Sequence, residues 1–421
     1  MTQILRGNIV HAPEMGRLDI LEHGCLVLED GAITGLYRQL PEELANAEVR
    51  DFGDRLIMQS FADMHLHAPQ YPMLGMGMDL PLLDWLNTYT FPTEARFADV
   101  DYARRVYRRL ATDLITNGTT RVCMFSSMHT DATLVLMDEL ERAGVTGYVG
   151  KVNMDRNGLP GKLQETTEES VRETLRWLDG CHFAHVKPII TPRFTPSCTN
   201  ELMTQLGKLA NERGLYVQSH LSENTNEIAW VRELHPDCTQ YWETYNKYGM
   251  WKDHTLMAHC VHSDERERRA IKDAGVVVVH CADSNVNICS GICPVRQMVR
   301  EGLWVTLGSD IAGGAQLPMY KVITMSIRTS KARRVTDEWH PDFLTVPEGY
   351  YLGTTAGHKY FGAGDGFAVG DRLHAVVIDD GDFPEAAHPL SVQERFERAI
   401  YMTHRHNIVS VWSDGREVVR R

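Results

Sequence analysis

The chain has 421 residues, long enough for two or three domains of ordinary size or for a barrel with a smaller companion domain. Its 43 basic and 56 acidic side chains give a formal net charge of -13, which argues against a surface for nucleic acid or anionic membrane. A hydrophobic fraction of 43% and a charged fraction of 24% exclude global disorder.

No apolar run approaches the ~20 residues that a membrane-spanning helix needs. The N-terminus has no basic segment followed by an apolar one, so we expect no signal peptide, no membrane association and a cytoplasmic location. Nine scattered cysteines, none spaced as Cys-x-x-Cys, predict neither a disulfide framework nor a thiolate zinc site. Histidine is frequent, at 19, so imidazole and carboxylate are the expected ligands of any metal.

Both ends of the chain have the pattern of short β-strands and turns. Apolar runs flank Gly31 near the N-terminus, and similar runs flank Asp414 and Gly415 near the C-terminus. Asp-Gly between short apolar runs is a hairpin signal. We therefore predict a small β-sandwich domain assembled from residues 1–57 and 366–421.

Between these ends, eight β-branched runs alternate with amphipathic segments. The predicted strands cover residues 56–63, 119–126, 145–153, 186–194, 216–220, 255–260, 276–281 and 304–310. The predicted helices, which have ordinary cap residues, cover residues 101–117, 131–143, 167–180, 199–213 and 263–274. The alternation favours a closed (β/α)8 TIM-type barrel over residues 58–365. A doubly wound open sheet is the alternative, but no Gly-x-Gly-x-x-Gly follows the first strand.

Histidine or aspartate stands at or just past the end of four predicted strands. His65 and His67 follow the first strand and, as residues i and i+2, point to the same face ~6.6 Å apart. His220 ends the fifth strand, His259 lies at the end of the sixth and Asp310 ends the eighth. Active sites of (β/α)8 barrels lie where the carboxyl ends of the strands meet. We therefore expect these side chains to share one site.

A carboxylate lies close to this set. Glu223 follows His220 by three residues, so both can line one site only if the chain turns after His220. Three histidines, an aspartate and a nearby glutamate that is not a ligand are typical of a catalytic metal site with an open position for water. Zinc is the default metal and iron the alternative. The fourth strand ends in Arg193-Phe194, with Lys187 at its start and no lysine at its end to bridge a second metal, so one metal is expected.

The order of these site residues along a predicted barrel resembles that of the amidohydrolase superfamily and, within it, of the guanine deaminase family. The more restricted motifs are Asp-Leu-Pro-Leu-Leu-Asp-Trp-Leu at residues 79–86 and Pro-Arg-Phe at 192–194. The other matching stretches are residues 63–71, 89–94, 218–224 and 284–285, with Asp310. The resemblance covers about residues 50–365. Ala282 replaces a proline that many relatives have, and Ser309 replaces their commoner threonine.

The resemblance implies hydrolysis of guanine to xanthine and ammonia by a homodimer with one zinc ion per chain. It implies metal binding by His65, His67, His220 and Asp310. Glu223 would shuttle protons and His259 would steady the attacked centre or the water. Asp310 or Glu223 would protonate the departing amine. His262, three residues after His259, is an alternative for the role of His259.

The same resemblance implies how the small-molecule purine is bound. Gln70 would supply an amide for the purine edge, Arg193 a guanidinium for the carbonyl oxygen and Phe194 an aromatic face for the ring. His259 would also contact the substrate.

Three other functions fit the sequence less well. A related aminohydrolase could act on an isoxanthopterin-like pterin, 8-oxoguanine, a triazine or an adenosyl-type nucleoside. A barrel that had lost catalysis and served in assembly would be expected to lack the ligands that this chain retains. A nucleic-acid deaminase would need His-x-Glu and Pro-Cys-x-x-Cys motifs, which do not occur.

Overall fold

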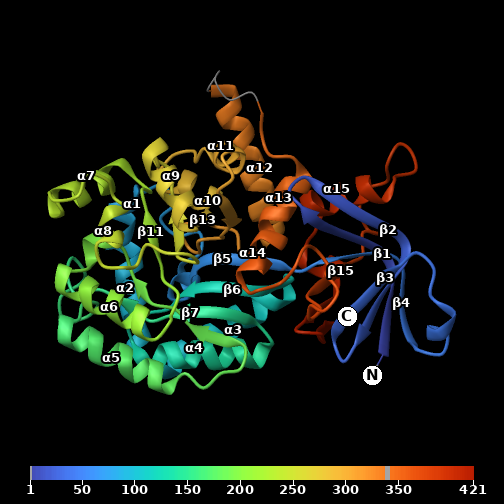
Figure 1. The fold of residues 1–421 in the computed structure, drawn as a ribbon, viewed down its shortest axis with the longest axis horizontal. Coiled ribbons are helices and arrows are strands. Elements are labelled where there is room, and N and C mark those ends of the chain that lie inside the picture. The colour runs from blue at the N-terminus through green and yellow to red at the C-terminus, as the bar shows by residue number, and fades with distance from the viewer. Residues whose placement is uncertain (1, 337–341) are drawn as a thin grey trace.

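The structure is a computed structural model and describes residues 2–336 and 342–421 (Figure 1). Strands and helices from the middle of the chain form one body. Strands from the two ends form a sheet beside it, and both termini lie at that sheet. Strands from both ends of the chain lie together beside the barrel, as the sequence predicts.

The barrel has two parallel four-stranded sheets, β5-β6-β7-β9 and β11-β12-β13-β14. Their strands are β5 (Phe61–His67), β6 (Thr119–Phe125), β7 (Thr146–Gly150), β9 (Val186–Pro188), β11 (Gln218–Leu221), β12 (Leu256–His259), β13 (Val277–His280) and β14 (Trp304–Leu307). A parallel bridge between Ile190 and Val217 joins the sheets on one side. On the other side the Asp310 N–H donates to the His65 carbonyl at 2.8 Å. Main-chain hydrogen bonds therefore join the two sheets on both sides, and the predicted barrel is confirmed.

The predicted start of the first barrel strand is wrong. The chain divides at Ser60, because β4 (Glu48–Gln59) pairs with strands of the terminal sheet, whereas the Phe61 N–H donates to Gly118 of the barrel at 2.9 Å. His65 and His67 consequently lie within β5, not after it. Predicted strands three and four are also interrupted, and their second parts pair as β8 (Val152–Asn153) and β10 (Thr191–Pro192).

The five predicted helices are present as α3 (Val100–Thr116), α4 (Thr130–Ala143), α5 (Thr167–Gly180), α6 (Asn200–Glu212) and α9 (Glu265–Ala274). Side chains at Asp99, Thr166, Thr199 and Asp264 accept the first N–H groups of α3, α5, α6 and α9. The Leu-rich segment around Trp85, which the sequence also predicts as an amphipathic helix, is the short α1 (Leu82–Trp85). The helices without a sequence prediction are α2 (Phe91–Ala95), α7 (Thr225–Leu234), α8 (Glu243–Asn246), α10 (Ala282–Asn287), α11 (Val295–Arg300), α12 (Met319–Thr336), α13 (Val346–Gly353), α14 (Thr355–Tyr360) and α15 (Val392–Met402). Within residues 2–336 and 342–421, no helix is long and apolar enough to cross a bilayer.

The terminal sheet has seven strands in the order β17-β16-β15-β4-β1-β2-β3. Besides β4 they are β1 (Thr2–Glu14), β2 (Arg17–Glu29), β3 (Ala32–Tyr37), β15 (Ala375–Ile378), β16 (Ile408–Ser413) and β17 (Arg416–Arg420). The predicted turns at Gly31 and at Asp414-Gly415 join β2 to β3 and β16 to β17. Leu5, Ile33 and Trp412, from both ends of the chain, lie in one apolar core. The division of the chain into two domains, with boundaries at residues 57/58 and 365/366, stays a prediction.

His11 of β1 gives the terminal sheet a pH-dependent stability. Its ring is 7% exposed, and the Phe367 N–H donates to Nδ1 at 3.2 Å, which requires an unprotonated nitrogen. Burial lowers the pKa of His11 to about 4. An unfolded histidine titrates near pH 6.5, so the stabilisation by neutral His11 is complete above that pH and is lost as the pH falls towards 4.

We therefore expect the melting temperature to fall between pH 7 and pH 5, with His11 accounting for about 2 kcal/mol of the lost stability. In His11→Gln, which keeps a hydrogen-bond acceptor but does not titrate, the fall should be smaller. Thermal unfolding at both pH values checks this. Equal falls in the two proteins would show that His11 is not responsible.

Candidate active site

One pocket at the carboxyl ends of the barrel strands gathers the predicted site residues. It encloses about 450 Å³, including its mouth. The predicted residues that line it are His67, Gln70, Arg193, Phe194, His220, Glu223, His259 and Asp310. His65 is 2% exposed and contacts Asp310 from β5. The structure thus brings every predicted site residue to one place.

Imidazole nitrogens and a carboxylate oxygen converge in the floor of this pocket. His67 Nε2 lies 3.2 Å from His220 Nε2. Asp310 Oδ1 lies 3.2 Å from His65 Nε2 and 3.5 Å from His67 Nε2. One ring nitrogen from each of His65, His67 and His220 lies within 4.8 Å of the others. A group of this size and composition can hold a divalent cation.

The protonation states of these residues fit a metal site. Burial and neighbouring histidines hold the pKa of His67 and His220 well below the usual histidine value, so both rings are neutral. His220 Nδ1 donates to the Arg193 carbonyl at 2.6 Å, which leaves a lone pair on the Nε2 that faces His67. Burial opposes ionisation of Asp310, but the nearby histidines, His65 foremost, keep its pKa well below the ordinary value. Neutral imidazoles beside an ionised carboxylate are the forms that bind metal.

A second group of potential ligands overlaps the first and contains Cys281. Atoms of His65, His259, Cys281 and Asp310 also lie within 4.8 Å of one another. Burial and nearby carboxylates raise the pKa of the Cys281 thiol well above its usual value. A protonated thiol is a poor ligand, so the set with three histidines and Asp310 is favoured.

Asp310 is held in place from two sides. Ser284 donates to Asp310 Oδ2 at 2.5 Å. The neighbouring Ser309 donates through its main-chain N–H and its hydroxyl to Asp63, at 2.9 and 2.5 Å. A side chain at Gly308 would place its Cβ 2.8 Å from the His65 Cβ, so glycine permits the close approach to β5. Asp63, which no sequence argument singled out, therefore joins β5 to the Asp310 loop.

The turn required to bring Glu223 into the pocket occurs at Ser222. Ser222 has a left-handed conformation with φ of 47°. As a result, the side chains of Glu223 and His220 line the same pocket. Ser290 donates to Glu223 Oε1 at 2.9 Å, and Oε2 lies 3.6 Å from His259 Nε2. Burial raises the pKa of Glu223, although nearby His259 opposes the shift. A carboxyl group with a raised pKa is suited to moving protons near neutral pH.

His259 is oriented by Asn285 of α10. The Asn285 side-chain oxygen lies 2.9 Å from Nδ1, so Nε2 is directed towards Glu223 and Asp310, at 3.6 and 3.8 Å. Burial disfavours the charged ring, but the two carboxylates outweigh this effect and raise the pKa of His259. A charged or hydrogen-bonding ring at this position can stabilise negative charge in the pocket.

The predicted substrate-binding residues form a buried hydrogen-bonded group. Arg193 donates to both oxygens of Glu94, at 2.5 and 3.0 Å. Gln70 Nε2 donates to Glu94 Oε1 at 2.9 Å, and the Ala312 N–H donates to Gln70 Oε1 at 3.0 Å. Phe194 lines the pocket, with its ring centroid 6.5 Å from that of His220. The sequence assigned Glu94 no role, although it lies in a stretch that resembles the family.

The sequence left open a pocket-lining role for Trp85 and assigned none to several other residues that line the pocket. Together with Trp85, these are Leu82, Leu86, Glu227 and Ile288. The restricted motif at residues 79–86 was the available signal for Leu82, Trp85 and Leu86. Glu227 accepts from the Glu223 N–H at 3.0 Å and from the Tyr241 hydroxyl at 2.7 Å. Burial, together with Glu223, raises the pKa of Glu227 to about 7. Glu227 therefore supports the segment that carries Glu223.

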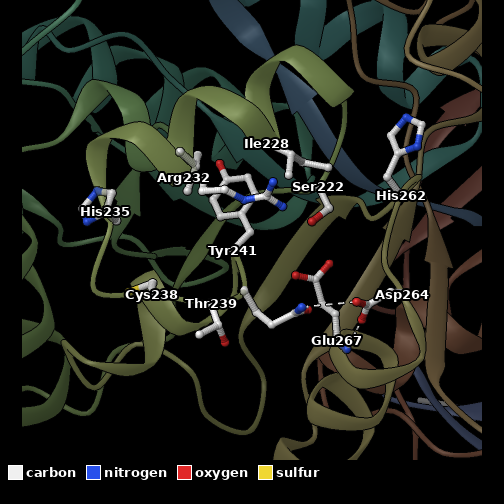
Figure 2. Close-up of a pocket in the computed structure, with 12 residues that line it drawn as sticks. Ser222, Ile228, Arg232, His235, Cys238, Thr239, Tyr241, His262, Asp264 and Glu267 are labelled. Carbon is white, nitrogen blue, oxygen red and sulfur yellow. Dashed lines mark hydrogen bonds between the residues drawn. The ribbon is translucent and has the colours of Figure 1, made fainter.

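A second cavity of about 580 Å³ lies beside the Ser222 turn (Figure 2). Figure 2 shows His262, Asp264 and Tyr241 at its wall. His262 Nε2 lies 2.7 Å from the Ser290 carbonyl, with which it can hydrogen-bond. His262 therefore faces this second cavity, whereas His259 faces the catalytic pocket, as favoured from the sequence.

The sequence and the fold of this chain are similar to those of several known proteins. The model of the amidohydrolase family matches residues 56–418. The guanine deaminase of Dictyostelium discoideum is 33% identical over 450 residues, covering 99% of this chain and 98% of that protein. The guanine deaminase of Mus musculus is 35% identical, covering 99% and 96%. A crystal structure of guanine deaminase from C. acetobutylicum with guanine in its active site is 42% identical, with a TM-score of 0.95, covering 99% of this chain and 100% of that one.

Proposed function

The chain belongs to the amidohydrolase family, and we propose that it hydrolyses guanine to xanthine and ammonia. The proposal is carried by the likeness to a guanine deaminase with guanine in its active site, at 42% identity over nearly the whole of both chains. The pocket agrees with it, because a set of metal-binding side chains lies beside buried amide, guanidinium and aromatic groups. These are the groups that a neutral, planar ring with a carbonyl oxygen needs.

We propose that His65, His67, His220 and Asp310 hold one zinc ion. When bound, the metal would act as a Lewis acid that lowers the pKa of water from ~15.7 to about 7 and so supplies a nucleophile at neutral pH. The hydrogen bond from His220 Nδ1 to the Arg193 carbonyl orients one ligand, and the hydrogen bond from Ser284 orients Asp310.

Glu223 is the proposed proton carrier. Its carboxylate accepts a proton from the attacking water and transfers it to a ring nitrogen, which makes the amino-bearing carbon more electrophilic. The water oxygen adds to that carbon. Glu223 or Asp310 then takes the remaining proton from this oxygen and gives it to the amine, which departs as ammonia when the carbon–nitrogen bond breaks. His259 stabilises the charge that develops on the attacked centre. One guanine and one water thus give one xanthine and one ammonia.

Gln70, Arg193 and Phe194 are the proposed substrate-binding residues. The Arg193 guanidinium is 3% exposed and donates to a carbonyl oxygen of the ring, while Phe194 packs against the ring face. Gln70 hydrogen-bonds the ring edge. Because Glu94 already balances the charge of Arg193, a neutral purine can enter without leaving a buried charge unpaired.

Removal of the metal is expected to abolish ammonia release. Dialysis against a chelator should lower the turnover of guanine at least about 100-fold, because none of the chain's own groups generates hydroxide at neutral pH. Adding back about one equivalent of zinc should restore it. Metal analysis and an ammonia assay on the same samples check this. Full activity in protein free of metal would contradict the zinc proposal.

The nearest alternative is a related aminohydrolase that acts on a pterin, 8-oxoguanine or another amino-heterocycle. A pterin also has a carbonyl beside an amino-bearing carbon, so Arg193 and Gln70 would suit it. Ammonia release from guanine, isoxanthopterin and 8-oxoguanine by metal-replete protein distinguishes these substrates. We expect the highest kcat/KM for guanine, and a strong preference for the pterin would favour the alternative.

The homodimer and the cytoplasmic location stay predictions. An assembly protein without catalysis is not favoured, because all four proposed ligands and Glu223 lie together in one buried site.

A further inference from the structure

We propose that Glu94 is a positioning residue that sets the specificity of the purine pocket by fixing which hydrogen-bonding atoms Gln70 and Arg193 present. This inference rests on the proposed function. Glu94 is 1% exposed and belongs to α2, and it is not among the residues that line the pocket. It acts through the two side chains that do line it.

Glu94 is the shared partner of both substrate-binding side chains. Its Oε1 accepts from Gln70 Nε2 at 2.9 Å and from one terminal nitrogen of Arg193 at 3.0 Å. Its Oε2 accepts from the other terminal nitrogen of Arg193 at 2.5 Å. Gln70 and Arg193 are 2% and 3% exposed, so little water is available to replace these bonds. Removing the carboxylate would leave buried donors unsatisfied.

The contacts of Gln70 allow only one orientation of its amide. A main-chain N–H can only donate, so the Gln70 atom 3.0 Å from Ala312 N must be the oxygen. An ionised carboxylate can only accept, so the atom 2.9 Å from Glu94 must be the nitrogen. The reversed amide would place two donors together at Ala312 and two acceptors together at Glu94. Ala312 and Glu94 together therefore fix the Gln70 amide, and Glu94 holds the end that carries its remaining N–H.

The contacts of Arg193 determine what the pocket accepts. The guanidinium has five N–H groups and no acceptor, and Glu94 uses two of them through two nitrogens. The fork is thereby held in one plane, and the Arg193 Cζ lies 5.2 Å from the Phe91 ring centroid. The remaining N–H groups can bond only to an acceptor. A ring with a carbonyl at this position is matched, and a ring with an amino group there places a donor against a donor.

Specificity for the 6-carbonyl of a purine should consequently depend on Glu94. Hypoxanthine keeps the 6-carbonyl of guanine but lacks its 2-amino group, and adenine carries an amino group in place of the carbonyl. In the wild-type protein, hypoxanthine should inhibit xanthine formation from guanine more strongly than adenine. A site built to bond a polar group discriminates strongly against a ligand that cannot make the bond.

The test is Glu94→Gln, which preserves the size of the side chain but replaces one acceptor by a donor. We expect kcat/KM for guanine to fall about 100-fold, since small displacements of positioning groups cost that much. We also expect the ratio of the adenine and hypoxanthine inhibition constants to fall at least about 10-fold, because the variant removes one of the two acceptor oxygens that hold Arg193 and Gln70. Xanthine formation with each inhibitor measures both quantities.

The matched control is Glu139→Gln. Glu139 is 4% exposed on α4 and also joins two arginines, Arg104 and Arg108, but it does not line the pocket. This variant should keep the wild-type kcat/KM and inhibitor ratio even if its melting temperature falls.

Three results distinguish failure of the positioning role, of the specificity role and of the proposed function. Unchanged kcat/KM in Glu94→Gln would overturn the positioning role. A lower kcat/KM with an unchanged inhibitor ratio would overturn the specificity role and leave a structural one. Failure of metal-replete wild-type protein to convert guanine would overturn the proposed function itself, before the variants are compared.

Discussion

Replacing Glu223 by glutamine is expected to lower kcat for guanine about 1000-fold, within the range that a positioned acid–base group contributes. Glutamine has nearly the same size and can still accept from Ser290, which donates to Glu223 Oε1 at 2.9 Å. It cannot take up a proton from water. Steady-state kinetics with guanine, together with metal analysis, measure the effect.

Glu267→Gln provides the matched control. Glu267 is 2% exposed and accepts from a serine hydroxyl, as Glu223 does, but it lines the second cavity and not the catalytic pocket. The control should retain kcat. Glu223→Gln should retain its metal, since Glu223 is not a proposed ligand. If Glu223→Gln kept more than about a tenth of the wild-type kcat, Glu223 would not be the proton carrier.

Replacing Asp310 by asparagine is expected to remove both metal and activity. Asp310 Oδ1 is 3.2 Å from His65 Nε2 and 3.5 Å from His67 Nε2, so its charge is central to the proposed ligand set. An amide lacks that charge, and Ser284 would hydrogen-bond it more weakly. We expect the bound zinc to fall well below one per chain, and kcat/KM to fall at least about 1000-fold.

Asp155→Asn separates this effect from a general loss of stability. Asp155 is a buried aspartate that accepts from the Thr199 N–H and the Thr167 hydroxyl, both at 2.7 Å, and it does not line the pocket. It should keep its zinc. Asp310→Asn protein with wild-type zinc content and activity would show that Asp310 is not a ligand.

The convergence of the five histidine and aspartate residues could be predicted because it follows from architecture. Parallel strands in a barrel end at the same face, so His220, His259 and Asp310 meet although they are far apart in the chain. The period of two within a strand brings His65 and His67 to one side of β5. Neither argument needs the exact strand boundaries, which is why the displaced start of β5 left the site intact.

The supporting residues could not be predicted because they depend on irregular backbone. The resemblance predicts Glu223 itself, but not the left-handed Ser222 that turns it into the pocket, because serine gives no local signal for that conformation. Glu94 meets Gln70 and Arg193 through the short helices between residues 82 and 95, whose path has no simple period. Asp63 and Glu227 act on main-chain N–H groups of distant or turning segments. Such contacts are properties of the folded chain alone.

The most direct test of the proposed function is the product analysis of guanine incubated with protein that contains about one zinc per chain. We predict equal amounts of xanthine and ammonia, formed by the wild-type protein and not by Glu223→Gln. If zinc-loaded, folded wild-type protein formed neither product from guanine, the proposed function would be wrong.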